Sequence, residues 1–142
     1  MSKISQKQQL IKLLPEKLQV KIGKEQEGPN CWNATINYHN PKSPSRFISG
    51  KYMDKWLEEN TKPIKSKEAK TGDILVFRAP NFQDDPDFTA TGTDLVHTVV
   101  LLKNKKIFHK VGWGGAYSIT TIKQAKKIYN YSSHFQWRRV RT

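Results

Sequence analysis

One cysteine and two histidines carry side chains suited to nucleophilic catalysis. Cys31, the single cysteine of this 142-residue chain, follows Asn30 in segment 28–38. Asparagine is a good N-cap, because its side-chain oxygen accepts a hydrogen bond from an unpaired N–H of the first helical turn. At a helix N-terminus, those N–H groups and the helix dipole favour the nucleophilic thiolate. The pattern predicts a reactive thiol, although a lone cysteine is also a common small buried hydrophobe.

A cysteine nucleophile needs a base, and that base needs an orienting partner. His97 lies in the apolar run 95–102, and His109 lies in 106–110, which is expected to pair with that run through a turn at Asn104. The two imidazoles can then lie close together on the sheet. His109 would bond one ring nitrogen of His97 and leave the other to face Cys31. Asp94 is an alternative orienting residue.

Other chemistries fit the sequence less well. Cys31, His97 and His109 could hold a catalytic zinc with a water, but no short-spaced ligand pair is present, so no metal and no other cofactor is expected. The acidic run 84–87 lacks the spacing of a calcium loop. His39 and His134 are expected at surface or structural positions. No pair of carboxylates stands out for glycoside hydrolysis.

The elements that must position these residues come as helices first and strands later. Helices are expected at 2–14, 28–38, 51–60 and 121–130, and strands at 74–77, 95–102, 106–110 and 135–140. The lysine-rich segment 61–70, the long segment 78–93 and the glycine-rich turn 112–115 are expected to be connections. This order predicts an α+β fold with a mostly antiparallel sheet.

Periodicity also predicts which residues point inward. The expected core positions at helical spacing are Met53, Trp56, Leu57, Ile122, Ala125, Ile128 and Tyr129. In the strand 95–102, alternation places Leu95, His97, Val99 and Leu101 on one face.

The charge balance limits the partners. The chain has 25 Lys and Arg against 12 Asp and Glu, a formal charge of +13, so its field attracts anionic polymers such as nucleic acid, lipid surfaces or acidic wall polymers. No nucleic-acid-binding motif accompanies the basic residues. No apolar run is long enough to span a membrane. The N-terminus lacks a signal-peptide core, so we expect a cytoplasmic protein, or a secreted or periplasmic one whose signal has been removed.

Three segments in order resemble the NlpC-like cysteine peptidases, papain-type enzymes of bacterial cell-wall cleavage. These are Asn30-Cys31 opening a helix, the run 70–77 with Gly72-Asp73-Ile74-Leu75-Val76-Phe77, and the run from His97 to His109. The family commonly shows G-D-L-V-F-F, then H-V-G-I-Y and a later I-H. The resemblance covers about residues 26–125. At the nucleophile the family usually reads D-C-S-G, whereas this chain reads Asn30-Cys31-Trp32-Asn33.

The resemblance implies a papain-like fold, with an N-terminal helical segment at 1–25 and a catalytic domain at 26–142. It implies Cys31 as nucleophile, His97 as base and His109 as orienting residue, with Trp32, Asn33 and Trp113 next to the substrate. The expected activity is cleavage of an amide bond in peptidoglycan peptides by a monomeric enzyme. Two alternatives remain open, namely an amidase or acyltransferase acting on a target outside the wall, and an inactive basic binding module.

Overall fold

The computed structural model describes residues 12–22, 30–80, 94–111 and 117–141, with the backbone alone at residues 21, 22 and 94. The helices are α2 (Glu16–Ile22), α3 (Cys31–His39), α4 (Gly50–Asn60) and α5 (Ile122–Ile128). The strands are β1 (Thr61–Ile64), β2 (Ile74–Ala79), β3 (Asp94–Leu101), β4 (Lys106–Lys110), β5 (Tyr117–Thr121) and β6 (His134–Val140). Two short 3₁₀ turns, η1 (Ser66–Glu68) and η2 (Lys103–Lys105), complete the described elements.

The strands form one sheet in the order β1-β6-β2-β3-β4-β5, and every neighbouring pair is antiparallel. The last strand, β6, lies between β1 and β2, so the C-terminal residues join two segments from the middle of the chain. The predicted α+β class with an antiparallel sheet is therefore confirmed.

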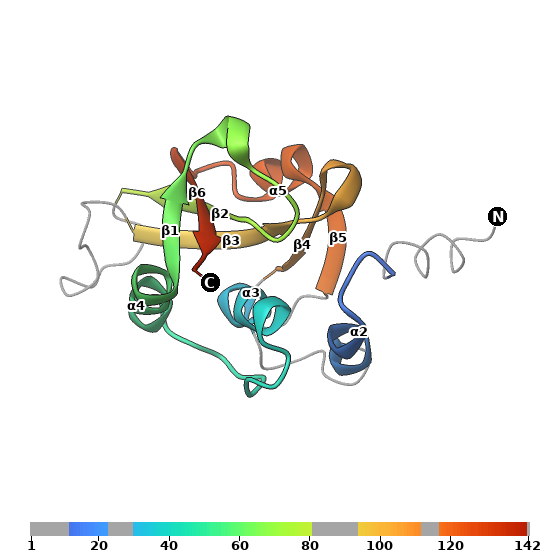
Figure 1. The fold of residues 1–142 in the computed structure, drawn as a ribbon. Helices are drawn as coiled ribbons and strands as arrows, with labels where there is room; N and C mark the ends of the chain where they lie inside the picture. Colours follow the sequence, from blue (N-terminus) through green and yellow to red (C-terminus); the bar gives the residue numbers. More distant parts are fainter. Residues whose placement is uncertain (1–11, 23–29, 81–93, 112–116, 142) are drawn as a thin grey trace.

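Helices cover both faces of this sheet (Figure 1). Helices α2, α3 and α4 lie on one face and α5 lies on the other. Below the sheet, Cys31 and Met53 are buried together with Ile74 and Val76 of β2. Above the sheet, Ala125 of α5 is buried against residues of β2, β3 and β4, namely Phe77, Val99 and Ile107. The sheet thus separates two apolar cores.

Helix α2 closes the lower core beside the cysteine helix. Leu14 and Leu18 are buried with Ala34 of α3 and Phe108 of β4. Helix α2 begins directly after Pro15, whose fixed φ angle suits the start of a helix. The predicted helix at 2–14 lies largely outside the described residues.

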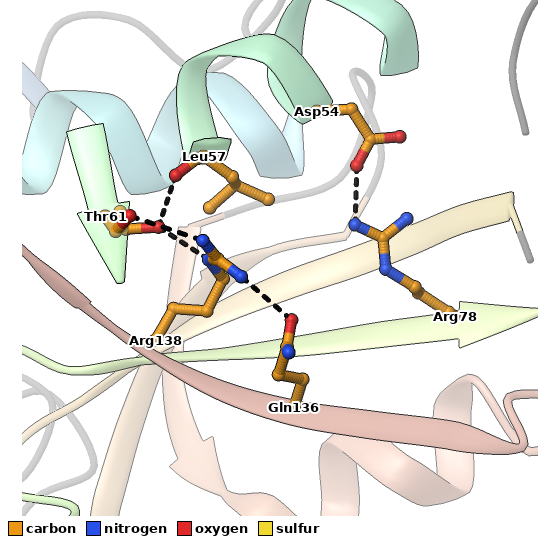
Figure 2. Close-up of polar contacts among 6 residues, drawn as sticks. All are labelled: Asp54, Leu57, Thr61, Arg78, Gln136 and Arg138. Carbon is orange, nitrogen blue, oxygen red and sulfur yellow. Dashed lines mark hydrogen bonds and ion pairs between the residues drawn. The ribbon is translucent and has the colours of Figure 1, made fainter. Parts of the chain in front are cut away.

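Helix α4 is fastened to the sheet by polar contacts as well as by its apolar side (Figure 2). The guanidinium of Arg78 lies 2.5 Å from Oδ1 of Asp54. Arg138 donates to Thr61 Oγ1 at 2.6 Å, and Thr61 Oγ1 in turn donates to the carbonyl of Leu57. These contacts tie the end of α4 and the start of β1 to β2 and β6.

Strands β1 and β5 were not predicted. β1 lies within the lysine-rich stretch 61–70, and it is a strand because it pairs with β6 from Thr61↔Val140 to Ile64↔Trp137. Pro63 is tolerated there because β1 is an edge strand. β5 forms the opposite edge by pairing with β4. Neither pairing leaves a local signal in the sequence.

Two predictions about residue orientation are wrong. Ile128 was expected to point inward, but it is 48% exposed, because α5 ends at this residue. Leu95 was expected on the same face as His97. A register shift gives the pairs Phe77↔His97 and Arg78↔Leu95, which leaves Val96 as the extra residue of a bulge. Leu95 therefore packs in the lower core with Cys31.

Candidate functional site

Cys31 is the first residue of α3, as predicted, and Asn30 caps the helix. The Asn30 side chain accepts a hydrogen bond from Asn33 N at 3.2 Å, and its amide donates to the carbonyl of Ile48 at 2.7 Å. The cap thus fixes both the start of α3 and the chain that leads into α4. Cys31 is held in the lower core with a 6% exposed side chain.

The surroundings of Cys31 favour the neutral thiol. Burial raises the pKa of Cys31 to about 12, although hydrogen bonds with the backbone at Thr98, Trp32 and Cys31 and the charge of Lys110 oppose that shift. Burial in an apolar core costs more free energy for a thiolate than the helix terminus returns. In this structure the thiol is protonated at neutral pH.

His97 and His109 contact each other above the sheet. His97 Nε2 lies 2.8 Å from His109 Nδ1, so the expected contact between the two imidazoles is present. The ring of His97 stacks on Tyr129, which follows α5, with centroids 4.0 Å apart, and meets the edge of Phe77 at 5.5 Å. Both partners belong to the upper core.

The imidazole pair and the thiol lie on opposite faces of the sheet. Thr98, the neighbour of His97, points down, since its hydroxyl oxygen lies 2.6 Å from that of Thr35 in α3. Successive side chains of a strand point to opposite faces, so His97 points up. The expected hydrogen bond from His97 to Cys31 is not among those of the described residues, since His97 Nδ1 has no partner there and His97 Nε2 contacts His109. The catalytic roles themselves stay predictions.

The His97–His109 pair is enclosed and uncharged. Both side chains are buried, and His97 Nδ1 and His109 Nε2 find no hydrogen-bond partner among the described residues. Burial lowers the pKa of His109 to about 4. Burial, and then the nearby His109, lowers the pKa of His97 well below its usual value. Neutral imidazoles packed among aromatic rings suit a core better than a proton-transfer site.

Two of the residues expected next to a substrate are part of the interior. Asn33 donates to the carbonyl of Pro44 at 3.1 Å and accepts from Arg46 N at 3.1 Å and from Asn37 at 2.8 Å. The bonds to Pro44 and Arg46 fasten the segment between α3 and α4, which gives Asn33 a structural role in the interior. Trp32 is buried in the lower core. The third expected residue, Trp113, lies outside the described residues.

Lys110 is a buried polar residue of the lower face that the sequence reasoning did not single out. It is fully buried, and its Nζ lies 5.6 Å from the ring centroid of Tyr117. Its charge acts on Cys31. Period-two alternation along β4 could have found it, because Phe108 and Lys110 share the face opposite His109.

The remaining predicted residues have unremarkable settings. His134 is exposed, and its Nδ1 lies 2.8 Å from Ser133 Oγ. His39 is half-buried against Tyr38, and burial lowers its pKa to about 4. The backbone of Asp94 begins β3, but its side chain, like the acidic run 84–87, lies outside the described residues.

Two features are absent from the described part of the chain. It contains no group of three or more His, Cys, Asp and Glu side chains placed to hold a metal ion. Its helices include none that is both long enough and apolar enough to cross a bilayer.

Comparison of the chain with protein-family models, with curated proteins and with solved structures gives no match. The resemblance to the NlpC-like peptidases therefore stands on the three sequence segments alone.

Proposed function

We propose that this protein is a non-catalytic binding module for anionic polymers, with a papain-like arrangement in which a helix that begins at a cysteine packs on an antiparallel sheet. The observation that carries the proposal is the placement of Cys31 and His97 on opposite faces of that sheet. A thiol nucleophile needs a base within hydrogen-bond reach, directly or through one water. The layer of β-strands between the two groups prevents that contact.

The chemistry of Cys31 supports the same choice. A thiol whose pKa is raised to about 12 by burial supplies almost no thiolate at neutral pH. Cys31 also packs against apolar residues of α4 and the sheet. It acts here as a small core residue.

The positive net charge of the chain indicates the class of ligand. A formal charge of +13 creates a field that concentrates polyanions near the surface and speeds their association. Nucleic acids, anionic lipid surfaces and acidic wall polymers all belong to this class.

A second candidate is a cysteine hydrolase that cleaves an amide bond of peptidoglycan, outside the cytoplasm. The specific observation in its favour is Cys31 at the N-terminus of α3, close to buried Lys110. The thiolate would attack the amide carbonyl, expel the amine and form a thioester that water then hydrolyses. The same chemistry on a target outside the wall would make the protein an amidase or acyltransferase.

Digestion of purified peptidoglycan by the parent protein and by Cys31→Ala separates the two candidates. We expect no fragments that depend on Cys31. Cys31-dependent fragments, identified by mass, would overturn the non-catalytic proposal. In parallel, binding to single-stranded DNA, polyglutamate and anionic vesicles at physiological salt tests the ligand class. If the protein binds none of these three polyanions, the proposal that its ligand is an anionic polymer is wrong.

A further inference from the structure

Positive charge is concentrated in the C-terminal third of the chain. Residues 95–142 contain seven lysines and three arginines but no aspartate or glutamate. All 12 acidic residues precede this segment. It forms nearly all of β3 and the whole of β4, β5, α5 and β6. Such an asymmetry between parts of a chain indicates a surface for an anionic partner.

Exposed rings gather where this basic segment covers the upper face of the sheet. We define the α5 patch as Lys123, Lys126, Lys127, Ile128, Tyr131 and Phe135. The three lysines are exposed on α5, while Tyr131 is 50% exposed and Phe135 is 41% exposed. Helix α5 lies on the face of the sheet away from α3 and α4 (Figure 1).

Lysines and rings are interleaved within the patch. The ammonium of Lys126 lies 4.3 Å from the centroid of the Phe135 ring. Phe135 is held from below by Phe77, with ring centroids 5.2 Å apart and planes at 79°. Tyr131 lies beside Tyr129 at 6.3 Å, and Tyr129 is stacked on the buried His97. The exposed rings are therefore supported by the upper core.

We propose that the α5 patch binds single-stranded nucleic acid, an inference that rests on the proposed polyanion-binding function. Sequence-tolerant binding of single strands combines cationic side chains for the phosphates with aromatic side chains on which bases stack. The patch offers both. A lipid surface would need a broader apolar face, and Ile128 is the one aliphatic residue in the patch.

The other exposed aromatic pair of the described surface makes a useful contrast. Phe47 and Tyr52 are 61% and 46% exposed near the start of α4. Arg46 lies over the Tyr52 ring at 5.2 Å. Helix α4, however, carries the carboxylates of Asp54, Glu58 and Glu59. This mixed charge makes Tyr52 a matched control for Tyr131.

The test is a fluorescence-anisotropy titration of labelled poly(dT) with the full chain at several salt concentrations. We expect Lys126→Glu combined with Lys127→Glu to weaken binding at least tenfold and to reduce the salt slope by about 1.4, because each phosphate contact on a single strand contributes about 0.7. Lys42→Glu combined with Lys51→Glu removes the same charge on the other side of the molecule and should change binding much less.

Stacking is tested separately from charge. We expect Tyr131→Ala to weaken binding about tenfold, as for loss of one stacked base, and Tyr131→Phe to restore it. Tyr52→Ala should leave binding unchanged. A DNA duplex should bind more weakly than poly(dT), because its bases are not available for stacking.

The outcomes distinguish this inference from the proposed function. If the two lysine-pair variants weaken binding equally while the parent still binds poly(dT), the α5 patch is not the binding surface. The proposed polyanion-binding function would then remain in place. Binding to anionic vesicles or polyglutamate but not to poly(dT) would overturn nucleic acid as the partner. Binding to none of them would remove the proposed function as well.

Discussion

Cys31 and His97 point away from each other across the same strand. His97 belongs to β3 and faces α5, whereas Cys31 packs beneath β3, where Thr98 contacts Thr35 of α3. The two residues whose types suggested a catalytic pair are thus close in the fold but separated by a layer of backbone. This relationship supports the proposed binding role over a catalytic one.

The reactivity of Cys31 should be low. Because burial raises the pKa of its thiol to about 12, we expect alkylation by iodoacetamide at pH 7 to be far slower than that of the unfolded protein, and to accelerate as the pH rises. Mass spectrometry over a pH series gives the rate. His97→Gln should not change this rate, because the imidazole faces the other core. Rapid alkylation at pH 6 that His97→Gln abolishes would contradict the separation of the two groups.

The hydroxyl pair between Thr98 and Thr35 provides a direct test of strand orientation. Their oxygens are 2.6 Å apart and buried. We expect Thr98→Val and Thr35→Val each to lower the free energy of unfolding by about 1–2 kcal/mol, since a buried hydroxyl loses its partner, and the double variant to lose less than the sum. Urea denaturation of the four proteins measures the coupling. Strict additivity would show that Thr98 does not face α3.

Acid should destabilise the fold through the imidazole pair. The pKa of His109 falls from 6.5 to about 4 on folding, so the unfolded chain binds the proton more readily. The stability that neutral His109 contributes is present above pH 6.5 and is lost as the pH falls toward 4. The loss is about 3 kcal/mol, because one pKa unit corresponds to about 1.4 kcal/mol.

Replacing the titrating group should reduce this acid sensitivity. We expect His109→Gln to flatten the decline of unfolding free energy between pH 7 and pH 4, as measured by urea denaturation at each pH. The exposed His134 gives the control His134→Gln, which should keep the slope of the parent. Identical slopes for all three proteins would contradict a buried neutral His109.

Asn33 should matter for stability and not for ligand binding. Its side chain makes three hydrogen bonds, two of which fasten the segment between α3 and α4 while the third joins Asn37 within α3, and it is only 2% exposed. We expect Asn33→Ala to lower the free energy of unfolding by about 2–3 kcal/mol, because buried backbone groups lose partners. Chemical denaturation is the measurement, and the exposed Asn40→Ala is the control. If Asn33→Ala is folded but no longer binds polyanions, Asn33 belongs to a ligand-binding site and this prediction is wrong.

Local sequence was sufficient for features that depend on a few neighbouring residues. Asn30 caps α3, and the apolar run at β2 is a buried strand, because capping and burial act within a turn or a strand. Composition likewise defined the positive charge and its concentration after residue 94. These properties supported the α+β class and an anionic partner.

Pairing between strands that are distant in the sequence determined which face of the sheet each side chain of β3 points to. The direction of a strand side chain depends on register, and one extra residue moves those beyond it to the other face. The bulge at Val96 places Leu95 beside Cys31, and regular alternation then places Thr98 below the sheet and His97 above it. The matching strands lie far apart in sequence, so spacing within 95–102 could not reveal which residue faces the thiol. The pairing of β3 with β2 and the packing of α3 beneath it determine that Cys31 meets Thr98 and not His97.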